Sequence, residues 1–275
     1  MTPSSLMRVL FAFAAAATTS AVPAAPTAFG TRTLEMPAPS GFVGVAASAP
    51  KFVEVSQAFL PAGNRLIEVY ATEADRAALA AGNGSELVRY LQLQVPRAME
   101  GKPVSQAEFS ANAKNIETGL AQSLGNIGRQ ATDLAGKGNA QIRSRTGTDP
   151  GMAISDIGFH GLYRREDWGL FFTLSSNVSV AGMASDRLIS AGAIVLINHQ
   201  LVYFYAFSRE RSAADAEWVK DTLSAWVDAV HAANPDDPAL EKASRRGGFD
   251  WSRVLVFAAI GGLVGGLYKL FRPNA

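Results

Sequence analysis

The residue types most able to do chemistry together are Asp156 and His160, which lie four positions apart. If this segment is extended, Asp156, Gly158 and His160 share one face of a strand, and a carboxylate could converge with an imidazole. Glu166 and Asp167 follow shortly after. This spacing matches no recognised metal-ligand pattern, so a polar strand end is the simpler interpretation. We predict no catalytic, cofactor-binding or metal-binding residue from these positions.

The other candidates for catalysis are weaker. His199 falls in a predicted hairpin turn, where we expect it to be exposed. His231 ends a predicted helix, where a cation suits the helix dipole. The chain has no G-x-S-x-G nucleophile motif, and Ser175 and Ser176 lie inside a strand pattern. No Walker A motif or dinucleotide fingerprint is present either. The sequence therefore assigns no reaction.

Composition limits the classes of function. Lysine and arginine total 25 against 24 aspartate and glutamate, a net charge of +1 that gives no indication of a nucleic-acid partner. The chain has no cysteine, which excludes disulfides, thiolate metal sites and a cysteine nucleophile. A folded domain without disulfides is compatible with a bacterial periplasm.

The elements that would position these residues are clearest in the second half of the chain. Ser105 and Glu108 have the spacing of a capping box, and we predict a helix from there to about residue 124 or further. Glycines and polar residues at 136–139 are taken as following that helix. Four strands and a closing amphipathic helix are then predicted at 153–163, 168–180, 188–198, 201–208 and 212–233.

The first half carries shorter patterns. Residues 65–72 mix a period of two with β-branched residues, which predicts a strand, and residues 52–60 are expected to pair with it across a turn. Residues 73–81 predict a short helix, and residues 87–95 a strand, with a helix as the alternative. Together the elements predict an α+β domain over 34–233, an antiparallel sheet with helices packed on it.

The element order resembles a known family. The segments that carry the resemblance are MPAPSGF, AFLPAGNRLIEVY, LISAGAIVLINHQLVYFYAF and DAEWVKDTLSAWVDAV. They look like the PsbP-like or DcrB-like α/β/α sandwich domains. That resemblance implies a small, exported, non-enzymatic domain. It lies in the order of elements, so it transfers no site residue.

The N-terminus has the pattern of an export signal. Arg8 precedes an apolar run at 9–17, and small residues follow with cleavage options after Ala21 or Ala24. The apolar run is too short to span a bilayer, which needs about 20 residues. We predict a signal peptide at 1–24 and a linker at 25–33. An uncleaved anchor or an alanine-rich leader is the alternative.

The C-terminus has the pattern of a membrane anchor. Residues 254–268 carry no charge, and the segment 251–271 would be roughly 31 Å long as a helix, which just spans a membrane. We predict a tether at 234–250, a transmembrane helix at 251–271 and a cytoplasmic tail at 272–275. Basic residues on the outer side oppose this orientation, but a large exported domain translocates largely regardless of charge. A removable sorting tail is the runner-up.

Two GxxxG pairs lie within the predicted anchor, Gly261 with Gly265 and Gly262 with Gly266. Residues four apart share one helix face, and small side chains let two backbones approach closely. The pairs predict a helix–helix contact, either with a second copy of the chain or with another membrane protein. Ordinary tolerance of glycine in membrane helices explains the same pattern.

These expectations lead to two functional hypotheses. The first is a membrane-anchored accessory or interaction module in the periplasm of a bacterium, held in the inner membrane by a single pass. The alternative is a periplasmic enzyme of unrecognised type with a site near Asp156 and His160. A deep polar pocket containing His160 and two or more carboxylates would favour the enzyme, and a filled core without it would favour the module.

Overall fold

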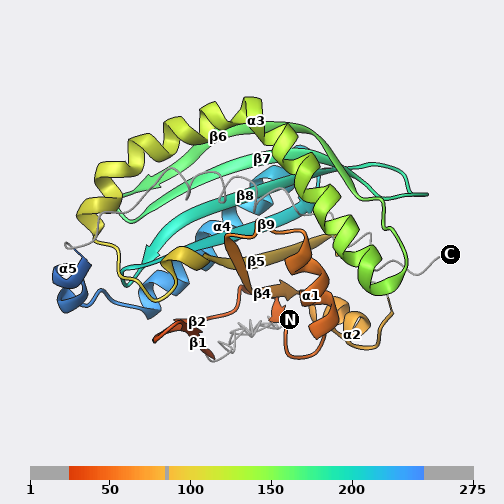
Figure 1. Ribbon diagram of the computed structural model, residues 1–275. Helices are drawn as coiled ribbons and strands as arrows, with labels where there is room; N and C mark the ends of the chain where they lie inside the picture. Colours follow the sequence, from red (N-terminus) through yellow and green to blue (C-terminus); the bar gives the residue numbers. More distant parts are fainter. Residues whose placement is uncertain (1–24, 84–86, 245–275) are drawn as a thin grey trace, which may run out of the picture.

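The computed structural model describes residues 25–83 and 87–244, which form an antiparallel sheet with helices on both of its faces (Figure 1). Within these residues the main sheet has seven strands in the order β3-β4-β5-β9-β8-β7-β6. The strands are β3 (Val43–Gly44), β4 (Asn64–Ala71), β5 (Arg89–Pro96), β6 (Ala153–Glu166), β7 (Gly169–Ser179), β8 (Asp186–Ile197) and β9 (Gln200–Arg209). The predicted α+β class and antiparallel sheet are confirmed.

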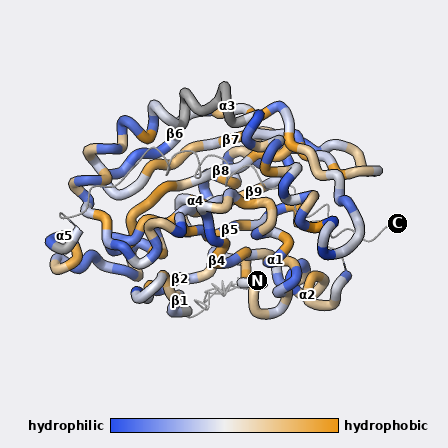
Figure 2. The backbone as a smooth tube through the Cα atoms, viewed as in Figure 1, coloured by the Kyte–Doolittle hydropathy of each residue, from blue (hydrophilic) through white to orange (hydrophobic). Residues whose placement is uncertain are grey.

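The helices divide between the two faces of the sheet. The long helix α3 (Gln106–Thr146) arches over one face together with α1 (Pro50–Ala58), and α4 (Ala213–Ala233) packs on the other (Figure 1). The remaining elements are the hairpin β1 (Ala25–Phe29) and β2 (Arg32–Met36), α2 (Glu73–Ala80), the 3-10 turn η1 (Arg97–Met99) and α5 (Pro238–Ser244). Hydrophobic colour concentrates on the central strands, and hydrophilic colour is frequent along α3 (Figure 2).

The predicted starts of the two long helices, α3 and α4, are confirmed by their caps. The Ser105 hydroxyl accepts a hydrogen bond from the backbone N–H of Glu108 at 3.0 Å. Ser212 and Asp215 form a capping box at the start of α4. The predicted apolar face of α4 is also confirmed, because each of its members is fully or almost fully buried: Val219, Leu223, Trp226, Val227 and Val230.

Strands β7, β8 and β9 match their predictions because each is a mostly buried run bounded by polar breakers. Strand β6 is also confirmed, although most of its residues are exposed or half-buried. The turn between β8 and β9 is Asn198-His199, and both residues have positive φ, 44° and 65°. Two successive residues of this kind make the tight turn whose twist matches a hairpin.

The pairing predicted for residues 52–60 is wrong, since residues 50–58 form helix α1. Pro50 occupies the first helical turn, and Phe52 and Ser56 are buried four residues apart. Helical spacing of the buried side chains decides the outcome over β-branched propensity.

The end of α3 also differs from the prediction, since 136–139 continue the helix to Thr146. At position 138 of α3 only glycine leaves room for the ring of Phe59, because a Cβ there would lie 2.3 Å from Cδ1 of that ring. Gly136 faces open space. The glycine that looked like a helix breaker is therefore a close contact between α3 and the end of α1.

The segments expected to be linkers are partly structured. Residues 25–33 include β1 and the start of β2, and Phe29 is fully buried. At the other end, Asn234 is buried and its side chain bonds both backbone groups of Glu35, at 2.8 Å and 2.7 Å. Residues 238–244 form α5. The expected tether thus begins as part of the folded domain.

The outer edge of β4 is closed by two side chains rather than by a full strand. The amide of Gln57 donates to the carbonyl of Asn64 at 3.1 Å and accepts from the N–H of Leu66 at 2.7 Å. Oε1 of Glu68 accepts from three backbone N–H groups, those of Val45, Ala46 and Val69, at 3.0, 2.8 and 2.9 Å. Strand β3 pairs only with the far end of β4.

The predicted signal peptide, anchor, tail and glycine pairs lie outside the described residues. Between residues 25 and 244, leaving aside 84–86, no helix has both the length and the hydropathy needed to cross a bilayer.

Candidate functional site

The residues first singled out by chemistry lie on neighbouring strands. Nε2 of His160 on β6 is 2.9 Å from the hydroxyl oxygen of Ser175 on β7. Arg187 on β8 also donates to that oxygen, at 3.2 Å, and its Nε donates to Glu210 at 2.6 Å. His160 is exposed, whereas Ser175 is only 2% exposed. The imidazole therefore sits over a serine hydroxyl that is closed off from solvent.

Asp156 lies near this cluster but binds elsewhere. Its carboxylate accepts from the amide of Asn177 at 2.6 Å, and its backbone has a φ of 49° where the β6–β7 register shifts. The strand irregularity turns Asp156 toward Asn177, two residues along β7 from Ser175. Glu166, expected nearby, pairs with Arg164. Among the described residues, no group of three or more histidine or acidic side chains could hold a metal ion.

The expectation for His199 is wrong, because its side chain is buried, with 4% exposed. Nδ1 of the ring lies 3.1 Å from the carbonyl of Val104, whose N–H donates to the carbonyl of His199 at 2.8 Å. The turn is covered by the segment that leads into α3. His231 lies in the last turn of α4, as predicted, with its ring stacked on Trp168 at a centroid distance of 4.1 Å.

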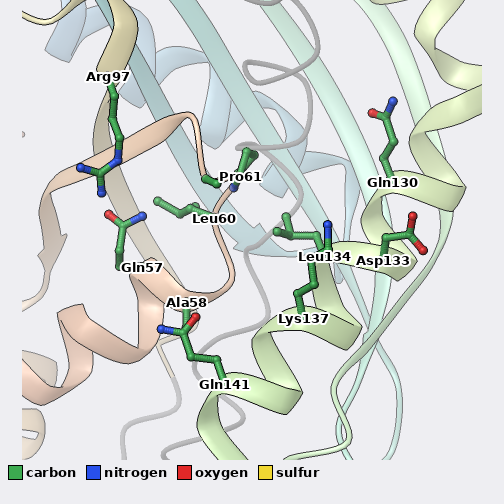
Figure 3. A pocket seen from close by; sticks show the side chains of 11 residues that line it. Gln57, Ala58, Leu60, Pro61, Arg97, Gln130, Asp133, Leu134, Lys137 and Gln141 are labelled. Carbon is green, nitrogen blue, oxygen red and sulfur yellow. The ribbon is translucent and has the colours of Figure 1, made fainter.

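A groove between α1 and α3 is the better-formed candidate site (Figure 3). Its volume is about 620 Å³, within the range of roughly 300–1,000 Å³ that is usual for ligand sites. One wall is the end of α1 with the loop after it and η1, and the other wall is one face of α3. The lining residues are Gln57, Ala58, Leu60, Pro61, Ala62, Arg97, Gln130, Asp133, Leu134, Lys137 and Gln141.

Local sequence explains both walls of the groove. Along α3, residues 130, 134, 137 and 141 recur at spacings of four and three, so they form one stripe of the helix. The neighbouring stripe, which includes Ala131 and Ala135, is buried in the core. An ion pair between Arg145 on α3 and Glu54 on α1 joins the walls near one end.

Two cations, one on each wall of this groove, have no ion-pair partner among the described residues. Within the described part of the chain, neither Arg97 nor Lys137 forms an ion pair. Burial opposes ionisation of Glu100, but the hydrogen bond and charge of Arg65 lower the pKa of its carboxyl, with a smaller effect of the nearby charge of Arg97. Asp133 is the one acidic lining residue, and its side chain points away from the loop that carries Leu60 (Figure 3). The lining is therefore basic, with apolar residues between the charges.

Further cavities lie elsewhere among the described residues. One of about 570 Å³ lies between α1 and the end of α2, and one of about 470 Å³ lies between the β1–β2 hairpin and β4. A third, of about 10 Å³, lies beside His199 and Trp168. None of these four cavities is lined by Asp156 or His160.

Comparison with models of known protein families finds no match, and comparison with curated proteins finds no similar sequence. The resemblance to PsbP-like or DcrB-like domains therefore stays a prediction.

The sequence did not indicate the groove. Its α1 wall was predicted as a strand, and its α3 wall extends through residues 136–139, which were predicted to follow the helix. The signal that could have found the second wall is the 130, 134, 137 and 141 spacing, which becomes visible only if helix is assumed to continue through Gly136 and Gly138.

Proposed function

We propose that this protein is a membrane-anchored periplasmic accessory module that acts by binding a partner in the groove between α1 and α3. The export-signal pattern at 1–24 and the apolar segment at 251–271, with its short tail at 272–275, support the compartment and the anchor. The two GxxxG pairs support a contact of the anchor with a second copy or another membrane protein.

The observation that carries the binding role is the composition of the groove. Its polar lining consists of Gln57, Arg97, Gln130, Asp133, Lys137 and Gln141. It includes no histidine and no serine, and its single carboxylate has no second acid beside it. Such groups can hold a ligand by charge and hydrogen bonds, but they do not form a nucleophile with an adjacent base.

The binding role can be tested in cells with a photo-crosslinking amino acid in the groove. We place it at Gln141, which is an exposed groove residue, and at Lys114, which is exposed on the same helix outside the groove. The binding role predicts a discrete adduct from position 141 that is absent from position 114. It also predicts loss of that adduct when Ala62→Trp fills the groove. Equal adducts from both positions, or none from 141, would reject this function.

A second candidate, a hydrolytic enzyme, is favoured by one observation, the 2.9 Å approach of His160 to Ser175. Nucleophile and base need this distance, and the neighbouring Arg187 would stabilise an anionic oxygen. Burial of Ser175 and the exposed position of His160 weigh against it. Esterase activity that disappears in both Ser175→Ala and His160→Gln would support the enzyme.

A further inference from the structure

The unpaired cations of the groove indicate the charge of its occupant. Arg97 on η1 and Lys137 on α3 approach the cavity from opposite walls, and the groove has one carboxylate against two cations (Figure 3). A cation without a partner attracts an anion, and walls of low dielectric strengthen that attraction. An anionic ligand would thus be held from two sides.

The length of the groove indicates an elongated occupant. The lining face of α3 runs from Gln130 to Gln141, eleven residues later, or about 17 Å along the helix axis. An extended peptide rises about 3.3 Å per residue, so about five residues match this length. Leu60, Pro61 and Leu134 lie between the charged groups and provide an apolar contact for a side chain in the middle of such a segment.

The amides of the groove suit a peptide backbone. Gln57 is fully engaged by the β4 edge, but the carboxamide oxygen of Gln130 is buried without a hydrogen-bond donor among the described residues. An unsatisfied buried acceptor destabilises the protein until a donor reaches it. Rotation of this side chain toward the groove would let a peptide N–H supply the missing donor. Gln141 offers a second, exposed amide at the other end of the same face.

We infer that the groove binds a short acidic peptide segment of a partner protein, about five residues in extended conformation. Two acidic side chains flank an aliphatic one and pair with Arg97 and Lys137. This inference rests on the proposed function and specifies the partner. It places recognition in side chains of α3 and η1, because the backbone groups at the neighbouring β4 edge are already bonded.

The test uses the full chain in detergent micelles and three fluorescein-labelled peptides, Glu-Glu-Leu-Glu-Glu, Gln-Gln-Leu-Gln-Gln and Lys-Lys-Leu-Lys-Lys, measured by fluorescence anisotropy. The acidic peptide should bind most tightly and should weaken as salt is raised. Exposed ion pairs contribute about 0.2–1 kcal/mol each, so Arg97→Gln and Lys137→Gln should each weaken binding about 1.5- to 5-fold. Lys114→Gln removes the same charge from α3 outside the groove and should leave affinity unchanged.

The outcomes separate this inference from the function on which it rests. Equal affinity for the three peptides, no binding of any, or equal effects of Lys137→Gln and Lys114→Gln would overturn the acidic-peptide assignment, even if the crosslink from position 141 persists. Displacement of the acidic peptide by an equal concentration of citrate would identify a small-anion site and also overturn it. Acidic-peptide binding that survives Ala62→Trp would place the site elsewhere and overturn both proposals.

Discussion

Two glycines in one helix predict opposite effects of the same substitution. Gly136 and Gly138 both lie inside α3, where alanine is favoured over glycine by about 1 kcal/mol. Gly136 faces open space, so Gly136→Ala should stabilise the protein by about that amount. For a domain of this size, that corresponds to a melting temperature about 2–4 °C higher.

At Gly138 the added methyl group meets the ring of Phe59. The new Cβ would lie 2.3, 2.5 and 2.9 Å from three ring atoms of a side chain that is fully buried. Overpacking a core costs about 1–3 kcal/mol, and three contacts below 3 Å place this site at the upper end. After subtracting the helix-propensity gain, we expect Gly138→Ala to lose about 2 kcal/mol, which lowers the melting temperature by about 4–8 °C.

The assay is thermal unfolding of the full chain in detergent, followed by far-UV circular dichroism, for wild type and both variants side by side. Phe59→Leu in the Gly138→Ala background should recover part of the loss, because a smaller side chain gives the methyl group room. If Gly138→Ala proved as stabilising as Gly136→Ala, the contact between α3 and the end of α1 would be refuted, and with it the geometry of the groove.

Three further predictions concern one titrating group and the two ends of the chain. Burial raises the pKa of Glu68 above its ordinary value of 4.5, against the opposing effect of three backbone N–H donors, so its ionisation costs stability as the pH rises through the folded-state pKa. The denaturant midpoint of Glu68→Gln should therefore equal that of wild type near pH 4 and exceed it at pH 7. If the difference between the two midpoints were the same at both pH values, this prediction would be wrong. A reporter active only in the periplasm, fused after residue 248, should be active, and truncation there should release a soluble domain; a truncated protein that resists alkaline carbonate extraction would place the anchor elsewhere. Replacing both glycines of either GxxxG pair with isoleucine should lower crosslinked oligomer content without releasing protein from the membrane; unchanged crosslinking in both variants would leave the glycines no role in association.

Sequence patterns predicted the second half of the fold better than the first. Strands β7, β8 and β9 are long, mostly buried runs, and α4 has a single apolar face. The hydrophobic pattern of each segment was therefore enough to predict its secondary structure. Residues 52–60 were predicted to pair as a strand, although burial of Phe52 and Ser56 four residues apart in the folded protein favours helix α1. Local patterns were insufficient where long-range contacts choose between two structures.

The candidate site residues also divide into those that local patterns could place and those that depend on long-range contacts. Strand periodicity placed Asp156 and His160 on one face of a strand, but it did not predict that His160 contacts Ser175 while Asp156 bonds Asn177. Burial of His199 did not follow from the sequence either, because it depends on Val104, 95 residues away. The groove required two corrections at once, a helix at 50–58 and the continuation of α3 through Gly136 and Gly138. Neither correction follows from local propensity, since the Gly138–Phe59 contact joins residues 79 positions apart.

The closed edge of β4 has a consequence for how this protein can associate. The unpaired backbone N–H and C=O groups of an open sheet edge can pair with an extended segment of another chain, which leads to aggregation. By bonding Asn64 and Leu66, the amide of Gln57 occupies the positions that an incoming backbone would need. Glu68 adds a half-buried carboxylate a short distance along the same strand. Copies of this protein are thus protected against pairing with one another through this edge.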